Sequence, residues 1–297
     1  MTRFRGAGTA LVTPFTTEGR IDFDALSKLI DWQIDQGIDF LVACGSTGEA
    51  QTLSREEREA VVAAAVRVAK GRVPVVAGAT SSDTATLVDE VKAMCGLGVQ
   101  AVMTACPYYN KPTQAGLERH FTMMADAASV PLIVYNVPGR TAINLDPRTT
   151  LRLARHPNIL AVKEASGNLG QIARIIAERP EGFLVLSGDD PLALAVIAMG
   201  GDGLISVISN AAPNATAALV GAALRSDLAA ARSLHYALLP LMDACFVESN
   251  PIPVKAALAL MGRMSPMVRL PLLPAASSTE AALRDALSHL DQARKAA

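Results

Sequence analysis

The chain has few of the side chains that bind transition metals or form disulfides. Its four cysteines contain no C-x-x-C pair, and its four histidines form neither an H-E-x-x-H motif nor a cluster with carboxylates. Because zinc and redox sites need such closely spaced ligands, we expect no catalytic metal. A chain of 297 residues also needs no disulfides to be stable, so the cysteines are expected to be reduced and buried.

The chain also lacks a net charge and an uninterrupted membrane-spanning run. The balance of 27 basic against 28 acidic residues gives a net charge of −1, which provides no general attraction for nucleic acid or an anionic membrane. Residues 203–224 are uncharged, but Asn210 and Pro213 interrupt them, so a buried strand, a turn and a core helix are expected there. The first apolar run ends at Thr13-Pro14, too early for a signal peptide. We expect a soluble, cytoplasmic chain.

Hydrophobic residues make up 51% of the chain, enough for a large core and too many for a disordered protein. Eight short apolar runs of strand length recur along the first two thirds, with helical patterns between them. Runs that are continuously apolar are typical of parallel strands covered on both faces. The runs are Ala7–Val12, Phe40–Cys44, Val73–Ala77, Ala101–Thr104, Pro131–Tyr135, Ile159–Val162, Phe183–Leu186 and Gly203–Val207.

Helix starts are also recognisable. Ser54 and Glu57 predict a capping box, and Asp146 and Asp190 each precede a proline, as capping acids do. Alternating strands and helices predict an α/β fold, a (β/α)₈ TIM barrel. An open doubly wound sheet is the alternative, although no G-x-G-x-x-G follows an early strand.

After about residue 225 only helical patterns follow. They cover Leu228–Met242, Pro251–Met261 opened by Asn250, and a last helix with Ser277 as its expected cap. We therefore predict a (β/α)₈ catalytic barrel over residues 1–224 and a C-terminal helical domain over residues 225–297.

Lys163 stands out because it directly follows a predicted barrel strand, and barrel active sites lie at the carboxyl ends of the strands. Burial there would lower the pKa of the lysine and free an amine that can form an imine with a ketone. The alternative is a structural ion pair with Glu164 or another acid.

Other polar groups end neighbouring strands. Tyr109, Tyr135 and Ser46 could form a proton relay. The Gly45–Gly48 turn offers backbone amides and hydroxyls to a carboxylate, and Arg140 could bind a second carboxylate with both arms of its guanidinium. These groups suggest two small keto- or aldehydo-acid substrates.

Six motifs occur in order along almost the whole chain: Gly45–Glu49 (GSTGE), Pro107–Asn110 (PYYN), Tyr135–Thr141 (YNVPGRT), Val162–Gly167 (VKEASG), Leu186–Asp190 (LSGDD) and Asn250–Lys255 (NPIPVK). In these motifs the chain resembles the family of pyruvate-dependent class I aldolases that contains dihydrodipicolinate synthases and N-acetylneuraminate lyases. The resemblance implies that pyruvate forms an imine on Lys163 and then attacks L-aspartate 4-semialdehyde. The product would be 4-hydroxy-tetrahydrodipicolinate, at the first committed step of the diaminopimelate and lysine pathway.

The resemblance also implies a homotetramer of two tight dimers and no organic cofactor. The implied catalytic residues are Lys163, Tyr135, Ser46 and Tyr109, with Tyr109 reaching in from a neighbouring subunit. In the implied substrate contacts, Thr47 binds the pyruvate carboxylate, Arg140 binds the semialdehyde carboxylate, and Gly188 and Ile205 line the site.

Two departures from the synthases of this family bear on function. Ser46 stands where those synthases commonly have threonine, which leaves the hydroxyl less fixed in direction. Synthases inhibited by lysine hold it with a glutamate and histidines, whereas the matching positions here are Thr86, Arg55 and Arg58. An added cation and a missing carboxylate should repel lysine, so we predict weak or no feedback inhibition.

Two other functions stay open on the sequence. One is a different pyruvate-dependent aldolase or dehydratase of the same family, acting on sialic acid or another keto-sugar acid. The other is a non-catalytic barrel that senses a keto acid, although such a barrel would be expected to lose relay hydroxyls.

Overall fold

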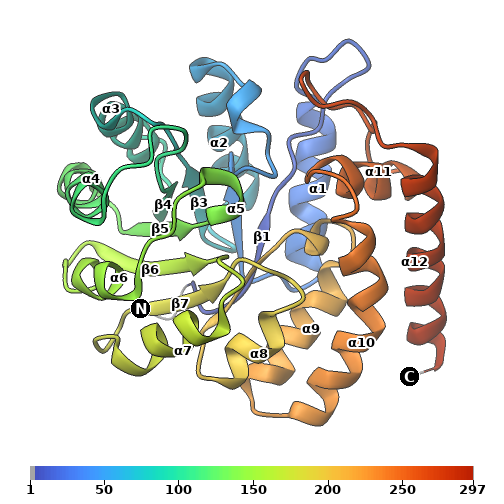
Figure 1. Ribbon diagram of the computed structural model, residues 1–297. Helices are drawn as coiled ribbons and strands as arrows, with labels where there is room; N and C mark the ends of the chain where they lie inside the picture. Colours follow the sequence, from blue (N-terminus) through green and yellow to red (C-terminus); the bar gives the residue numbers. More distant parts are fainter. Residues whose placement is uncertain (1–3, 297) are drawn as a thin grey trace.

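Eight parallel strands close into a barrel in chain order, β1 to β8 (Figure 1). The computed structural model describes residues 4–296, with side chains up to residue 292. The strands are β1 (Gly6–Ala10), β2 (Phe40–Ala43), β3 (Val75–Gly78), β4 (Ala101–Ala105), β5 (Leu132–Asn136), β6 (Ile159–Glu164), β7 (Leu184–Ser187) and β8 (Gly203–Ser206). The predicted (β/α)₈ barrel is therefore confirmed, and the hydrogen-bonded pairing of β1 with β8 excludes the open sheet.

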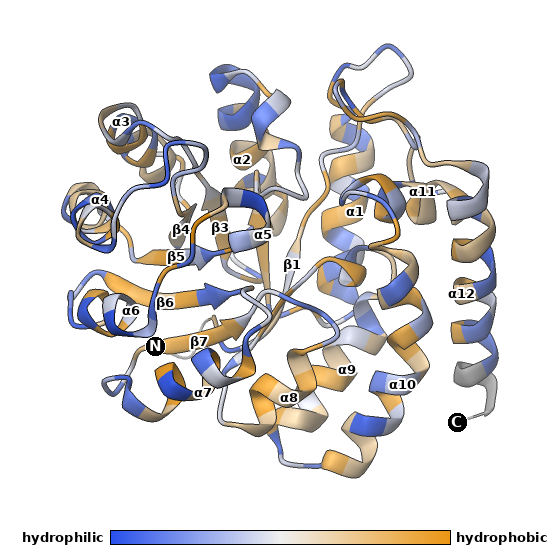
Figure 2. Cartoon of the chain, in the orientation of Figure 1, coloured by the Kyte–Doolittle hydropathy of each residue, from blue (hydrophilic) through white to orange (hydrophobic). Residues whose placement is uncertain are grey.

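Helices surround the strands and also form the C-terminal part of the chain (Figure 1). Figure 2 shows mainly hydrophobic residues on the strands, and hydrophobic and hydrophilic residues alternating on the outer helices. The helices are α1 (Phe23–Asp35), α2 (Arg55–Ala69), α3 (Thr84–Cys95), α4 (Gln114–Ala127), α5 (Pro138–Thr141), α6 (Pro147–Leu153), α7 (Leu169–Glu178), α8 (Ala193–Ala198), α9 (Pro213–Leu224), α10 (Leu228–Ala244), α11 (Ile252–Leu260) and α12 (Ser277–Ala296), with short 3₁₀ helices η2 (Ala50–Thr52) and η3 (Ile208–Asn210).

The start of α2 is confirmed, but two other expected starts are wrong. The Ser54 hydroxyl accepts from the Glu57 N–H, and the Glu57 carboxylate accepts from the Ser54 N–H, completing a capping box. Asp190 caps no helix, because its buried carboxylate accepts from the Ser206 hydroxyl and the Val207 N–H at the end of β8. Ser277 is the first residue of α12 rather than its cap.

The C-terminal helices pack on the barrel and on one another. Helix α10 contacts α8 and α9, and α12 contacts α10 and α11, so that α12 lies outermost in this group (Figure 1). Helix α9 ends at Leu224 and α10 begins at Leu228. A domain boundary between these two helices stays a prediction.

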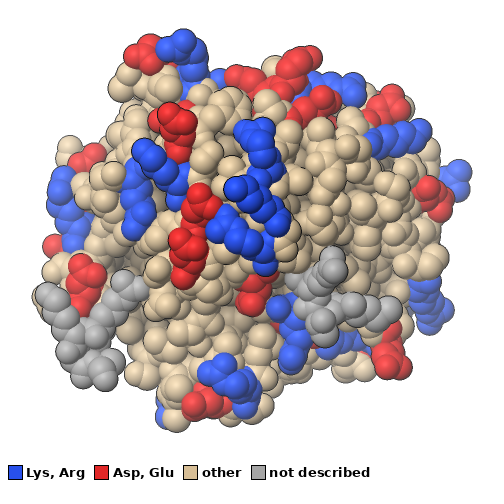
Figure 3. All heavy atoms as spheres, turned by 180° about the vertical axis from the view of Figure 1, so that it is seen from behind, with Lys and Arg blue, Asp and Glu red and all other residues tan. Residues whose placement is uncertain are grey.

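The residues expected to form a strand, a turn and a core helix over 203–224 do so, as β8, η3 and α9. Within the described residues, no helix is long and apolar enough to cross a membrane. On the face shown in Figure 3, basic and acidic side chains lie next to one another over the surface. This mixture agrees with the near-zero net charge.

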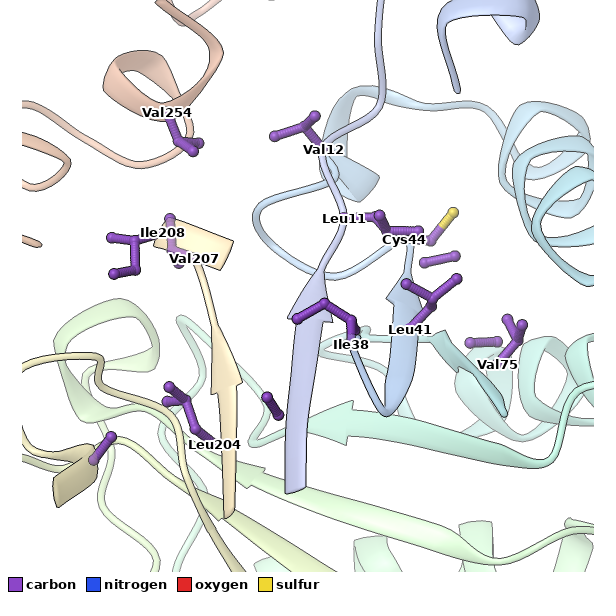
Figure 4. Close-up of a cluster of buried hydrophobic side chains, with 14 of the residues drawn as sticks. Leu11, Val12, Ile38, Leu41, Cys44, Val75, Leu204, Val207, Ile208 and Val254 are labelled. Carbon is purple, nitrogen blue, oxygen red and sulfur yellow. The ribbon is translucent and has the colours of Figure 1, made fainter. Parts of the chain in front are cut away.

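The core has two parts. The larger lies between the strands and the helices, and Figure 4 shows Leu204, Ile208 and Val254 of this cluster, from β8, η3 and α11. The smaller fills the inside of the barrel with alternate strand residues such as Phe40 and Ile133. Because side chains fill the inside, a substrate site is left only at the ends of the strands.

Candidate active site

A cavity of about 480 Å³ opens at the carboxyl ends of the strands. Six of the predicted site residues line it: Ser46, Thr47, Tyr135, Arg140, Lys163 and Gly188. Helix α10 adds part of the wall, with Met242, Asp243, Phe246 and Val247 on it or just after it. The cavity therefore lies between the barrel and the C-terminal helices, which the sequence did not predict.

Lys163 lines the cavity from near the end of β6. Its position in β6 pairs with that of Tyr135 in β5, and its Nζ lies 4.2 Å from the centre of the Tyr135 ring. The side chain is only 5% exposed. The pKa of Lys163 is lowered to about 8, mainly because burial desolvates the amine; the Asp190 carboxylate opposes this shift and Arg140 adds to it.

The structural alternative for Lys163 is not supported. Among the described residues, no acid forms an ion pair with it. The Glu164 carboxylate instead accepts hydrogen bonds from the Asn136 side chain and the Ser166 N–H. Lys163 is thus a buried amine facing a cavity, with no ion pair to explain its burial, and such groups are typical of active sites.

The pH dependence of imine formation tests this lowered pKa. At pH 7 an amine of pKa about 8 is about 10% neutral, whereas an ordinary lysine is only about 0.03% neutral. Raising the pH deprotonates Lys163, so the rate of imine formation should rise from pH 7 to about pH 9 and then level off. Asp190, with a pKa raised to about 6, is ionised over this range. Rapid quenching of a pyruvate mixture with borohydride measures the rate, and a rate still rising steeply at pH 10 would contradict the assignment.

Tyr135 is suited to donating a proton. The pKa of its phenol is raised to about 12, mainly by desolvation; Arg140 opposes this shift and Asp189 adds to it. The phenol is therefore protonated at neutral pH. The two charged groups that act on its pKa, Arg140 and Asp189, both line the cavity.

Asn250 holds together the two predicted carboxylate-binding residues. Its Nδ2 donates to Thr47 Oγ1 at 2.9 Å, and its backbone oxygen accepts from Arg140 Nη2 at 3.0 Å. In the sequence, Asn250 was recognised only as part of a motif and as the expected start of a helix. Helix α11 in fact starts at Ile252, which leaves the Asn250 side chain free to reach Thr47.

A buried ion pair fixes the turn that carries Ser46 and Thr47. Glu49 ends this turn in a left-handed conformation, with a φ of 53°. Its carboxylate accepts from Lys255 Nζ at 2.5 Å and from the Arg269 N–H at 3.0 Å. Lys255 is fully buried. Helix α11 is thereby joined to the active-site turn of β2.

Gly188 leaves space for the lysine. A Cβ atom built on it would lie 2.8 Å from Ala165 Cβ and 2.9 Å from Lys163 Cε. Any larger residue would therefore displace the Lys163 side chain.

Two predicted site residues lie elsewhere. Ile205 is fully buried in the cluster inside the barrel, because its position in β8 points the side chain inward, and it is not among the residues that line the cavity. Tyr109 is 91% exposed with a φ of 72° and does not line the cavity. Within the described residues, no three His, Cys, Asp or Glu side chains gather into a metal-binding group.

A second, smaller cavity contains two of the positions expected to decide lysine binding. It has a volume of about 210 Å³ and is lined by Arg58 and Thr86. It also contains Glu90, whose carboxylate lies 2.9 Å from Arg58 Nε. Arg55 does not line it and instead pairs with Glu59.

Comparison with known proteins assigns this architecture to a family. Residues 3–290 match the dihydrodipicolinate synthetase family. The chain belongs to this family. It is 56% identical, over 92% of its length and 91% of the relative's, to the 4-hydroxy-tetrahydrodipicolinate synthase of Koribacter versatilis. The chain is therefore a lyase of the dihydrodipicolinate synthetase family, as the six motifs indicated.

Two solved structures of the family are similar over almost the whole chain. The Acinetobacter baumannii dihydrodipicolinate synthase, complexed with pyruvate, is 41% identical with a TM-score of 0.95, covering 97% of this chain and 99% of that one. The Cyanidioschyzon merolae enzyme, with lysine bound, is 37% identical with a TM-score of 0.94, covering 97% and 98%.

Proposed function

We propose that this chain condenses pyruvate with L-aspartate 4-semialdehyde to form 4-hydroxy-tetrahydrodipicolinate, the first committed step of the diaminopimelate and lysine pathway. The observation that carries the proposal is the buried Lys163 amine, with its pKa lowered to about 8, beside Tyr135 in a cavity that also contains Arg140. The family relationship supports the choice of substrates, because the relatives are named for this reaction.

The reaction would proceed through an imine. The neutral Nζ of Lys163 attacks C2 of pyruvate, and water leaves after protonation of the oxygen. Loss of a C3 proton gives an enamine, whose C3 forms a bond to the aldehyde carbon of the second substrate. The amine of that substrate then attacks C2, which closes the ring and releases Lys163.

The residues that line the cavity would share these steps. Tyr135, protonated at neutral pH, would give and take the protons of the imine steps, with Ser46 as its relay partner. Thr47, held by Asn250, would bind the pyruvate carboxylate. Arg140, held by the Asn250 backbone oxygen, would bind the semialdehyde carboxylate.

Trapping the imine tests the proposal. Incubation with pyruvate and borohydride should reduce the imine, and mass spectrometry should locate the adduct on Lys163. Turnover of L-aspartate 4-semialdehyde should then exceed that of sialic acid or other keto-sugar acids. An adduct on another lysine would contradict the mechanism, and faster turnover of a sugar acid would contradict the choice of substrate.

We further propose that L-lysine inhibits this enzyme weakly or not at all. The smaller cavity contains the Glu90 carboxylate, which could attract an ammonium group, but Arg58 already pairs with it. Since an ammonium group would have to displace Arg58, about 10 mM L-lysine should lower the rate by less than about a fifth. Initial rates with added lysine measure this, with a lysine-inhibited synthase as the control. Half-inhibition at about 1 mM would overturn the expectation.

We also propose that the chain forms a homotetramer in which Tyr109 completes a neighbouring subunit's site. Tyr109 is almost fully exposed, as expected for a side chain that acts on another copy. A Tyr109→Phe chain and a Lys163→Met chain, each inactive alone, should then recover about a quarter of full activity when co-expressed, because mixed dimers contain one intact site. Activity no higher than that of the separate variants would contradict the shared site. A cytoplasmic location stays a prediction.

A further inference from the structure

Asp189 is a carboxylate at the cavity that the mechanism above does not use. It follows β7 and lines the cavity together with Lys163 and Arg140. Among the described residues its side chain forms no ion pair. Its backbone, in contrast, is fixed: the Ser187 hydroxyl donates to the Asp189 carbonyl oxygen at 2.8 Å. A partly buried carboxylate on a fixed backbone, without a cationic partner, is available to a bound cation.

The strand order places this carboxylate and Arg140 on opposite sides of the reacting lysine. Arg140 follows β5, Lys163 lies in β6 and Asp189 follows β7, and these three strands are neighbours in the barrel. Both charged groups act on the Tyr135 phenol: Arg140 lowers its pKa and Asp189 raises it. The cavity therefore has a positive and a negative group, one on each side of the position where the imine would form.

The second substrate of the proposed reaction has matching charges. Its α-carbon carries both a carboxylate and an ammonium group, two bonds from the aldehyde carbon. With its carboxylate on Arg140 and its aldehyde at the lysine, the ammonium group would face the β7 side. An ordinary aldehyde or sugar acid lacks this second charge.

We propose that Asp189 binds the α-ammonium group of the second substrate and accepts a proton from it before ring closure. This inference rests on the proposed function. One N–H proton passes to the Asp189 carboxylate, and the nitrogen lone pair forms the bond to C2 of the iminium. The electrons of the C=N bond move to Lys163 Nζ. The proton then passes from Asp189 to Nζ. The ring nitrogen gives its second proton to the Asp189 carboxylate, and its lone pair forms the protonated C=N bond of the ring as the C2–Nζ bond breaks. Lys163 leaves as the neutral amine and Asp189 passes the proton to water, so both residues return to their initial state.

Asp189 is preferred over Asp243, the other carboxylate of the cavity wall. Asp189 is partly buried, and burial raises its pKa while the Leu192 N–H opposes the shift. A carboxylate that accepts and returns a proton works best with a pKa nearer neutrality. Asp243 lies on α10 and is exposed to solvent, which weakens its attraction for an ammonium group.

The test is the variant Asp189→Asn, with Asp243→Asn as the matched removal of a charge from the same cavity. We expect Asp189→Asn to lower kcat/KM for L-aspartate 4-semialdehyde by about 100-fold and Asp243→Asn by much less. Succinate semialdehyde, which lacks the amine, serves as the second probe. The rate at which its adduct with pyruvate accumulates on Lys163, trapped with borohydride, should be the same in Asp189→Asn as in the unmodified chain within about twofold.

Several outcomes would overturn the inference. These are unchanged kcat/KM in Asp189→Asn, an equal loss with both aldehydes, or a larger loss in Asp243→Asn. Failure of the proposed function would look different, because the unmodified chain would then form no pyruvate adduct on Lys163 or would not turn over L-aspartate 4-semialdehyde. A loss confined to the amine-bearing aldehyde, with the pyruvate adduct intact, supports the assignment.

Discussion

Replacing Lys163 with methionine is expected to lower kcat by more than about 1,000-fold, because no other group in the cavity can form the imine. The variant should nevertheless fold at least as stably as the unmodified chain. Burial lowers the pKa of Lys163 to about 8, so the folded state disfavours the charged amine, whereas methionine is apolar and of similar length. Steady-state rates and urea unfolding measure the two effects.

Two outcomes would contradict this account of Lys163. Activity within about tenfold of the unmodified chain would mean that the imine is not required. A large loss of stability would mean that the amine has a structural role. Gly188 has no side chain and lies against Lys163 Cε. A larger residue at position 188 would therefore displace the lysine.

Replacing Lys255 with methionine is expected to have the opposite effect, a loss of about 3–5 kcal/mol of folding stability. Lys255 is also buried, and desolvation lowers its pKa to about 8, but Glu49 opposes the shift. Its removal leaves the Glu49 carboxylate in the interior with the Arg269 N–H but without its counter-charge. Because Glu49 ends the turn of Ser46 and Thr47, kcat should fall as well. Urea unfolding measures the change in stability.

The double variant Glu49→Gln/Lys255→Met provides the control. It removes both charges, so its loss of stability should be smaller than that of Lys255→Met alone. A loss below about 1 kcal/mol for Lys255→Met, or one that grows in the double variant, would show that the ion pair does not hold the turn.

The barrel was predictable because its strands have an unmistakable pattern. Continuous apolar runs such as Ile159–Val162 are typical of strands buried on both faces, and each run coincides with an observed strand to within two residues. The site followed from the same pattern, since Lys163 directly follows the apolar run and lies near the carboxyl end of β6. An acidic residue before a proline was a less reliable signal of a helix start. Asp190 precedes a proline, as capping acids do, but its carboxylate accepts a hydrogen bond from Ser206 at the end of β8.

The remainder of the site depends on contacts between distant parts of the chain. Asn250 reaches Thr47, and Lys255 reaches Glu49, across about 200 residues. Nothing in the local pattern of either segment indicates which partner it meets. The inward direction of Ile205 likewise depends on the register of β8, which is set by its pairing with β1.

The joining of Lys255 to Glu49 has a consequence for how the enzyme is made. During translation Glu49 leaves the ribosome long before Lys255, which lies 206 residues further along. Until then the barrel would have an acidic group without its counter-charge beside the substrate-binding turn. Contacts so far apart in sequence form late, so the turn should reach its working shape only near the end of synthesis. The enzyme would then become active only after the C-terminal helices have been made. A ribosome that stalls within these helices would leave a barrel unable to process pyruvate.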